Sequence, residues 1–166
     1  MQPLASVPAG IDIFIDANIF VYALNNMSAQ CLLLLERCSR EEVTGISLFE
    51  IVNEATHKFM LAEARSKGLI SPTGNAAQLR NNFTVIPALI DYWHETERIL
   101  ALNLLVFSTD EQIIRSAQPE RQGASVLTND SMILSWMREY GIQHLATSDR
   151  DFERATGITV FSPDDI

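Results

Sequence analysis

A short apolar segment near the start of the chain, IDIFIDANIFVYAL at residues 11–24, limits the choice of fold more than any other part of the sequence. Its first six residues fit a strand buried on both faces, because the apolar run is short and lies between Gly10 and the polar Asn18. That strand ends in an acid, Asp16, and an unpaired buried carboxylate is energetically costly. The segment therefore predicts a central strand whose last residue has an interaction partner or a functional role.

Strand-like and helical segments alternate along the rest of the chain. Four further strands are expected at 43–47, 104–108, 142–148 and 158–163, with helices between them. This alternation predicts parallel β–α–β units with helices on both faces of one sheet. A length of 166 residues suits a single domain over residues 1–166, and no linker, repeat or low-complexity stretch divides it.

Local signals refine the limits of several elements. Ser47 and Glu50 fit a capping box at the start of a helix. The stretch at 61–102 predicts a long helical extension, and the segment PERQGAS at 119–125 predicts a loop. Residues 1–9 are expected to form a flexible N-terminus.

Acidic residues lie close to the ends of the predicted strands. Asp16 ends the first strand, and Asp149 follows the fourth within LATSDRDF. Asp130 opens the helix that begins at TND, and Glu54 lies near the second turn of the helix after the second strand. The carboxyl ends of parallel strands meet at one edge of a sheet, where sites form in such folds. We therefore expect these four acids to lie close together.

Each of these acids also has a purely structural explanation. An acid in the first turn of a helix interacts favourably with the helix dipole, which accounts for Asp130. Asp149 can cap the turn that follows it, and Asp16 can cap the helix after the first strand. Glu54 can pair with Lys58, four residues later on the same helix. The sequence alone leaves these alternatives open.

The net charge of −9 and the sequence pI of about 4.7 argue against nucleic-acid binding, because phosphate contacts need lysine and arginine. The charge has a different meaning if several acids converge. Carboxylates at one edge repel one another, and a hard divalent cation with oxygen ligands, Mg²⁺ or Mn²⁺, relieves this repulsion. Sites of this kind activate water for phosphodiester hydrolysis.

Two further features concern redox state and location. Cys31 and Cys38 lie seven residues apart in a helical segment, too far apart for a disulfide, so we expect two small buried apolar side chains. The first residues lack the pattern of a signal peptide, and no apolar stretch is long enough to cross a bilayer. A cytoplasmic location without membrane association is the expectation.

Four stretches of the sequence resemble the PIN-domain ribonucleases, particularly the VapC-type toxins of bacterial toxin–antitoxin pairs. In order, they are FIDANIFVYAL, VNEATHKFM, LTNDSMILSWMREYGI and LATSDRDFERATGITVFSP, and together they span nearly the whole chain. The resemblance implies a PIN-like, Rossmann-like three-layer α/β/α sandwich with a central, mostly parallel five-stranded sheet. It also implies cleavage of single-stranded RNA with one or two Mg²⁺ or Mn²⁺ ions, a homodimer, and inhibition by a cognate antitoxin.

The resemblance also assigns roles to individual positions. The catalytic, metal-ligating carboxylates are Asp16, Glu54, Asp130 and Asp149. The supporting residues are Asn18, Thr147 and Asp151. The basic candidates for RNA contact are Lys58, Arg65 and Arg150, each of which is also explained as a solvated surface charge.

Two other functions remain open at this point. A PIN-like fold without catalysis would serve as an RNA- or protein-binding module, although a scaffold needs no focused charge. A phosphohydrolase with an aspartyl nucleophile would use a second acid two residues after Asp16. This chain has Asn18 at that position, which disfavours the phosphohydrolase.

Overall fold

Six strands form one sheet at the centre of the molecule. The computed structural model describes all 166 residues, and its strands lie in the order β1-β6-β5-β2-β3-β4, with every neighbouring pair parallel. They are β1 (Gln2–Pro3), β2 (Asp12–Ile15), β3 (Thr44–Leu48), β4 (Leu105–Phe107), β5 (His144–Ala146) and β6 (Thr159–Ser162). The predicted parallel sheet is confirmed, and its strand count differs from the expected five because β1 adds a sixth strand at one edge.

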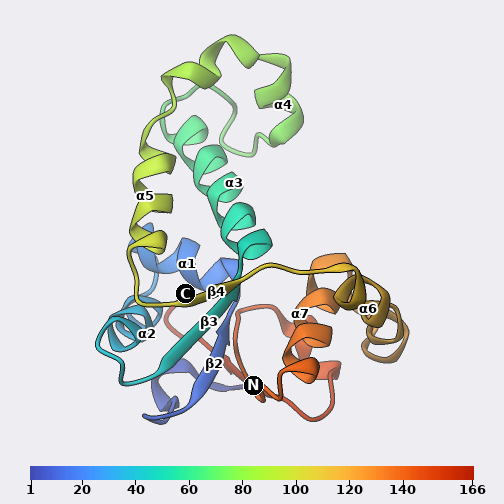
Figure 1. Cartoon of the computed structure of the whole chain (residues 1–166). Coiled ribbons are helices and arrows are strands. Elements are labelled where there is room, and N and C mark those ends of the chain that lie inside the picture. Colours follow the sequence, from blue (N-terminus) through green and yellow to red (C-terminus); the bar gives the residue numbers. More distant parts are fainter.

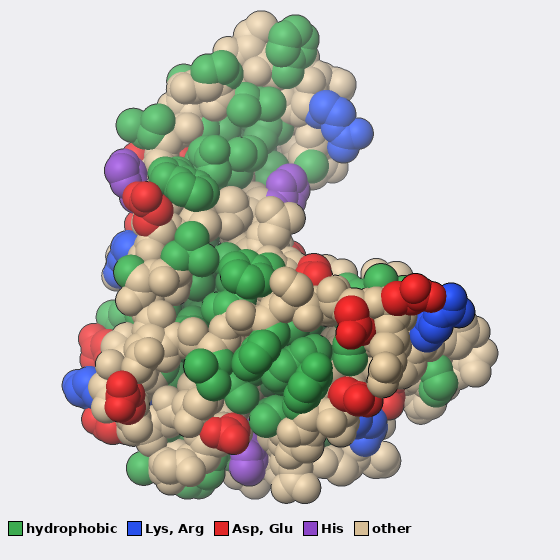
Figure 2. Space-filling view, viewed as in Figure 1, with side chains coloured by type: hydrophobic (Ala, Val, Ile, Leu, Met, Phe, Trp, Pro, Cys, Tyr) green, Lys and Arg blue, Asp and Glu red, His purple; other side chains and the backbone are tan.

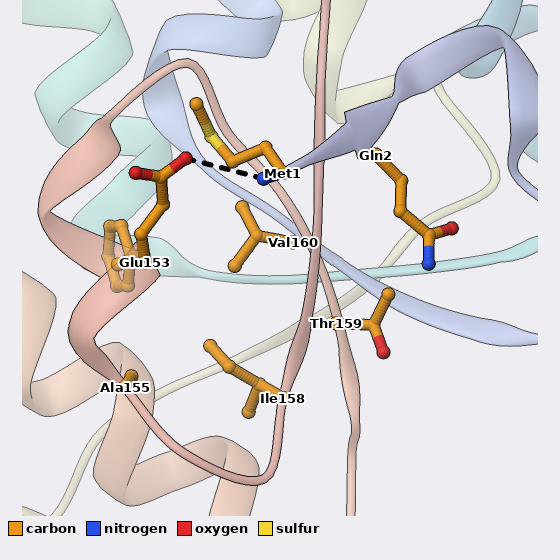
Figure 3. A pocket seen from close by; sticks show the side chains of 8 residues that line it. Met1, Gln2, Glu153, Ala155, Ile158, Thr159 and Val160 are labelled. Atoms are coloured by element: carbon orange, nitrogen blue, oxygen red, sulfur yellow. Dashed lines mark hydrogen bonds and ion pairs between the residues drawn. The ribbon is translucent and has the colours of Figure 1, made fainter.

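The N-terminus is attached to the sheet. β1 pairs with β6, and the side chains of Leu4 and Val7 are buried. The terminal amino group of Met1 lies 3.3 Å from a carboxylate oxygen of Glu153, as the dashed line in Figure 3 shows. Residues 1–9 were expected to be flexible, and burial of these two apolar side chains instead holds them against the sheet.

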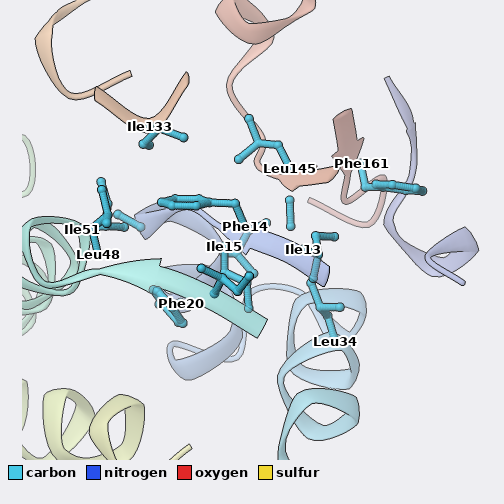
Figure 4. Close-up of a cluster of buried hydrophobic side chains, with 14 of the residues drawn as sticks. Ile13, Phe14, Ile15, Phe20, Leu34, Leu48, Ile51, Ile133, Leu145 and Phe161 are labelled. Atoms are coloured by element: carbon cyan, nitrogen blue, oxygen red, sulfur yellow. The ribbon is translucent and has the colours of Figure 1, made fainter. Parts of the chain in front are cut away.

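Helices cover both faces of the sheet. They are α1 (Ala17–Leu24), α2 (Ala29–Ser39), α3 (Phe49–Ser66), α4 (Ala76–Asn81), α5 (Asp91–Leu100), α6 (Glu111–Ala124) and α7 (Thr128–Glu139), with short 3-10 turns η1 (Leu4–Ser6), η2 (Phe83–Ala88) and η3 (Arg150–Arg154). Figure 4 shows Phe14 of β2 pointing toward Ile133 of α7, whereas Ile13 lies toward Leu34 of α2. Neighbouring strand residues point to opposite faces, so β2 is buried between two helical layers. The predicted three-layer architecture is confirmed.

A glycine in β3 lets α2 pack closely against the sheet. A Cβ atom at Gly45 would lie 2.5 Å from Cδ2 of Leu104 and 2.9 Å from Sγ of Cys38. Cys31 and Cys38 are both free and buried, and burial raises the pKa of each thiol to about 11. The two cysteines are therefore packing residues, as the sequence predicted.

No single helix is long and apolar enough to span a membrane. Only α1 and α2 taken together reach that length and composition, and they are bent by 105° relative to each other.

The stretch at 61–102 forms a helical arm that projects from the sheet (Figure 1). The arm consists of the later part of α3, α4, η2 and α5, and it has a small apolar cluster of its own, made of Ala64, Ile70, Leu79 and Leu89. A buried carboxylate, Glu63, joins its two long helices. The Glu63 oxygens accept hydrogen bonds from the backbone N–H groups of Ile90 at 2.9 Å and Tyr92 at 2.8 Å.

The start of α3 differs from the prediction. Its N-cap is Leu48, and Ser47 remains in β3, where its hydroxyl donates to the carbonyl oxygen of Ile15 at 3.0 Å. Glu50 accepts a hydrogen bond from the backbone N–H of Thr109 at 3.2 Å, just after β4. The capping box predicted for Ser47 and Glu50 is therefore wrong, because both side chains bond to neighbouring parts of the fold instead.

Helix α6 continues through the segment that the sequence predicted as a loop. Pro119 lies inside the helix, which ends only at Ala124. The buried residues Ile113, Ala117 and Ala124 keep a helical spacing across the proline, and α6 packs against α7. The prediction of a loop at 119–125 is wrong because this packing outweighs the local cost of a proline in a helix.

Candidate functional site

Asp16 is buried at the end of β2, with 7% of the residue exposed. One carboxylate oxygen accepts a hydrogen bond from the N–H of Ala17 at 2.7 Å and so caps α1. The other accepts hydrogen bonds from Oγ1 of Thr147 at 2.7 Å and from the amide of Asn18. Burial raises the pKa of Asp16 to about 6, although Thr147 and Lys58 act in the opposite direction. Asp16 therefore caps a helix and also turns one oxygen toward the end of β5.

A hydrogen-bond network joins the ends of β2 and β5. Asn18 donates from Nδ2 to Oγ1 of Thr147 at 3.0 Å, and its Oδ1 accepts from the N–H of Ser148 at 3.0 Å. The same Thr147 oxygen accepts from the N–H of Asp149 at 3.0 Å. Two polar side chains thus connect Asp16 to the backbone of Asp149.

Asp149 also begins the turn η3. Its Oδ1 accepts a hydrogen bond from the N–H of Asp151 at 2.8 Å, which is the capping role considered for it from the sequence. Asp151 lies 3.0 Å from the guanidinium of Arg154. Arg154 in turn donates to the carbonyl oxygens of Ala124 at 3.0 Å and Ser125 at 2.9 Å. These contacts hold η3 against the end of α6.

Both oxygens of Glu54 have partners. Oε1 lies 2.8 Å from Nζ of Lys58, one turn further along α3. Oε2 accepts a hydrogen bond from Nδ2 of Asn129 at 2.7 Å, across 75 sequence positions. Burial raises the pKa of Glu54, but the bonds from Lys58 and Asn129 outweigh burial and leave the pKa lowered. The helical pair expected from the sequence is present, together with a contact between α3 and α7.

Asn129 is the residue at this edge that sequence reasoning did not assign to the site. Its contact with Glu54 depends on the fold bringing the start of α7 near α3. The only sequence signal is its position next to Asp130 in TND, and that position is equally typical of an unremarkable helix start.

Asp130, in the first turn of α7, is surrounded by like charge. Its pKa is raised first by burial and then by the negative charge of Asp149, with smaller contributions from Glu54 and Asp151. Carboxylates act on one another in this way only over short distances. The structure thus brings the predicted acids to one edge of the sheet, while the position of Asp130 also suits the helix dipole.

The donor set suits a hard cation, although the side chains do not converge on one point. No three carboxylate, imidazole or thiol groups lie close enough together to hold a metal ion as they stand. The acids at this edge offer only oxygen donors, and their negative charges repel one another. Hard divalent cations such as Mg²⁺ and Mn²⁺ prefer such ligands. Binding one here requires rotation of side chains, and both oxygens of Glu54 are already engaged.

The acids lie where the arm meets the rest of the molecule. In Figure 1, α3 and α7 approach each other at the base of the arm, and these helices carry Glu54 and Asp130. Figure 2 shows the surface hollowed between the arm and the lobe made by α6 and α7, with acidic side chains along the lower rim.

Basic side chains near the acids are few. Lys58 is paired with Glu54. Arg65 donates from Nε to the carbonyl oxygen of Gly74 at 2.9 Å, so it anchors a loop within the arm. Arg150 is exposed in η3. Of the three basic residues considered for RNA contact, only Lys58 and Arg150 lie beside the acids.

Comparison with known families identifies a domain that covers most of the chain. A model of the PIN domain matches residues 13–158. No curated protein matches the sequence significantly.

Several solved structures share the fold. VapBC2 from Rickettsia felis, bound to a DNA fragment from their promoter, aligns with a TM-score of 0.62 and 14% identity over 92% of this chain and 99% of that chain. A toxin–antitoxin complex from Klebsiella pneumoniae aligns with a TM-score of 0.56 and 16% identity over 89% and 95%. VapC20 of Mycobacterium tuberculosis, described as a Sarcin-Ricin loop cleaving toxin, aligns with a TM-score of 0.57 and 13% identity over 88% and 96%. At these identities the likeness concerns the fold.

Proposed function

Because the chain belongs to the PIN-domain family, we propose that it is a metal-dependent endoribonuclease that hydrolyses phosphodiester bonds in single-stranded RNA. The observation that carries this proposal is the network in which Thr147 and Asn18 connect the buried Asp16 to Asp149. Burying a carboxylate is costly, and capping α1 uses only one of the two Asp16 oxygens. The solved toxin–antitoxin structures of similar fold support a role as the toxin of such a pair.

In this proposal each carboxylate has a task. Asp16, Asp130 and Asp149 would offer oxygen ligands, while Glu54 would ligate directly or through water and help to orient the attacking water. Bound Mg²⁺ or Mn²⁺ supplies the Lewis acidity that acidifies this water and neutralises charge on the leaving oxygen. The hydroxyl of Thr147 holds one oxygen of Asp16 in a fixed position. The expected products carry a 5′-phosphate and a 3′-hydroxyl.

The amide of Asn18 argues against the aspartyl phosphohydrolase. It donates to Asp16 and Thr147 and accepts from the backbone of Ser148. An amide in this network cannot give or take a proton as a general acid. These hydrogen bonds therefore suit a role for Asn18 in orienting Asp16.

We place the antitoxin in a groove between α1, α2 and α5. The groove encloses about 470 Å³ and is lined by Leu24, Leu32, Leu35 and Leu102, with Arg40 and Arg98 among its polar residues. A protein encoded beside this chain should co-purify with it and suppress cleavage. Leu32→Asp should abolish this co-purification, whereas Ile114→Asp, at an exposed position on α6, should not. Co-purification that survives Leu32→Asp would contradict the placement.

We place the homodimer contact on the outer face of the arm. Exposed apolar residues gather there: Phe83 and Ile86 in η2, Ile90 just before α5, and Trp93 and Leu100 in α5. Trp93→Glu should convert a dimer to a monomer in light-scattering measurements. A chain that is monomeric to begin with would contradict this arrangement.

Cleavage of single-stranded RNA in Mg²⁺ or Mn²⁺ tests the activity. Asp16→Asn should abolish cleavage. Asp12→Asn is the matched control, because Asp12 is exposed at the opposite end of the same strand. Cleavage that persists in Asp16→Asn would overturn the assignment. A protein that binds no Mn²⁺ even at millimolar concentration would instead be a non-catalytic PIN-like binding module.

A further inference from the structure

We use the term acid cluster for the four carboxylates Asp16, Glu54, Asp130 and Asp149. Lys58 contacts this cluster directly. Its Nζ lies 2.8 Å from Oε1 of Glu54, and 41% of the Lys58 side chain is exposed. The second Glu54 oxygen is held by Asn129 at 2.7 Å. Each oxygen of the Glu54 carboxylate therefore already has a nitrogen partner.

The charge of Lys58 also reaches the most deeply buried acid. It lowers the pKa of Asp16, while the charge of Glu54 raises it. The charges that raise the pKa of Asp130 belong to the carboxylates of Asp149, Glu54 and Asp151. Lys58 thus offsets the charge of Glu54, as Arg154 does that of Asp151, and it does so from a partly exposed side chain.

We propose that Lys58 is a tethered counter-ion of the acid cluster, which a divalent cation displaces from Glu54 when it binds. The inference rests on the metal site proposed above. A cation that uses Glu54 competes with the ammonium group for the same oxygen. Exposed ion pairs four residues apart on a helix are weak, so the displacement is easy, and the released side chain can turn out toward solvent.

The same helix provides a matched comparison. Lys67 pairs with Glu63 at the same four-residue spacing, at 2.5 Å, about 14 Å further along the helix axis. Lys58→Met and Lys67→Met therefore remove the same charge from pairs of the same spacing, although Lys67 also pairs with Asp91, and only the first pair touches the acid cluster.

Calorimetric titration with Mn²⁺ tests the inference. Lys58→Met should bind Mn²⁺ about three- to tenfold more tightly than the unmodified chain, because the competing cation is gone. Lys67→Met should bind like the unmodified chain, and Lys58→Arg should keep the weaker affinity. With Glu54→Gln as background, adding Lys58→Met should give a smaller gain, because the shared oxygen is lost.

Thermal unfolding gives a second readout. Added Mg²⁺ should raise the Tm of Lys58→Met more than that of the unmodified chain. The Tm of Lys67→Met should rise by the same amount as that of the unmodified chain. The role of Lys58 is overturned if Lys58→Met binds Mn²⁺ no more tightly than the unmodified chain. It is also overturned if Lys58→Met raises the affinity for Mn²⁺ equally in the Glu54→Gln background. Either result leaves the nuclease proposal standing. No Mn²⁺ binding by any variant overturns both.

Discussion

Asp16 shows how one residue can serve a structural and a chemical purpose. It caps α1 through one oxygen and meets Thr147 and Asn18 through the other. The sequence offered these as competing explanations, whereas the geometry makes them compatible, because a carboxylate has two oxygens. The burial that shields Asp16 also raises its pKa, and this has a measurable consequence.

The stability of the metal-free protein should depend on pH through Asp16. Its pKa is about 6 in the folded chain, against about 3.9 unfolded. The folded state therefore binds more protons between these values, and stability falls as the pH rises from 4 to 6. Asp16→Asn lacks this loss, so its stability relative to the unmodified chain should increase by about 2 kcal/mol between pH 4 and pH 7.

Urea unfolding in EDTA at both pH values measures this difference. Asp12→Asn serves as control, since Asp12 is exposed on the same strand. A stability difference for Asp16→Asn that does not change with pH would contradict the description of Asp16 as a costly buried acid.

At the scale of elements, Glu63 joins the two long helices of the arm. Its carboxylate is buried and receives Lys67 and the N–H groups of Ile90 and Tyr92. Burial raises its pKa, but these bonds outweigh burial and lower the pKa to about 2. The ionised form is therefore the one that holds α5 against α3.

Glu63→Gln should destabilise the protein by about 2 kcal/mol at pH 7, because a neutral amide replaces a charged acceptor. The stabilisation by Glu63 is present above its unfolded pKa of about 4.3 and is lost as the pH falls toward 2. The cost of the substitution should accordingly shrink at low pH. Chemical unfolding at pH 7 and pH 3 checks this, with the exposed Glu97→Gln as control. An equal cost at both pH values would contradict the role of the charge.

The elements also show which parts of the fold could be predicted. The apolar run before Asp16 identified the central strand, and the alternation of elements placed Asp149 at the same edge. Contacts between distant segments could not be predicted this way. Ser47 bonds to β2 rather than capping α3, and α6 persists through Pro119 because α7 covers one of its sides. Both outcomes depend on packing between segments, which no local pattern encodes.

The candidate site likewise has parts that could be predicted from the sequence and parts that could not. The positions of Asp16 and Asp149 could be predicted from the ends of the strands, because the carboxyl ends of parallel strands lie at one edge of a sheet. The partner of Glu54 was not predictable, since Asn129 reaches it only once the fold has brought the start of α7 near α3. Sequence reasoning thus located the edge, and the fold determined which side chains meet there.

At the scale of the whole molecule, the charge of −9 limits how RNA can bind. Of the three basic residues considered for RNA contact, only Lys58 and Arg150 lie beside the acids, which corresponds to about two phosphate contacts and a salt slope of roughly −1.4 for a single strand. Binding of single-stranded RNA by the inactive Asp16→Asn variant should weaken only about sevenfold between 50 and 200 mM salt. Fluorescence anisotropy measures this. A loss of a thousandfold would mean that an extensive basic surface exists elsewhere.

The central claim is that Asp16, Asp130, Asp149 and Glu54 form one metal site. The most direct test is an anomalous difference map from crystals of the chain grown with saturating Mn²⁺. We predict a peak at the carboxyl edge of the sheet, about 2.1 Å from oxygens of Asp16 and of Asp130 or Asp149, with Lys58 withdrawn from Glu54. A map without a peak at this edge, or with Mn²⁺ held only by other residues, would contradict the claim.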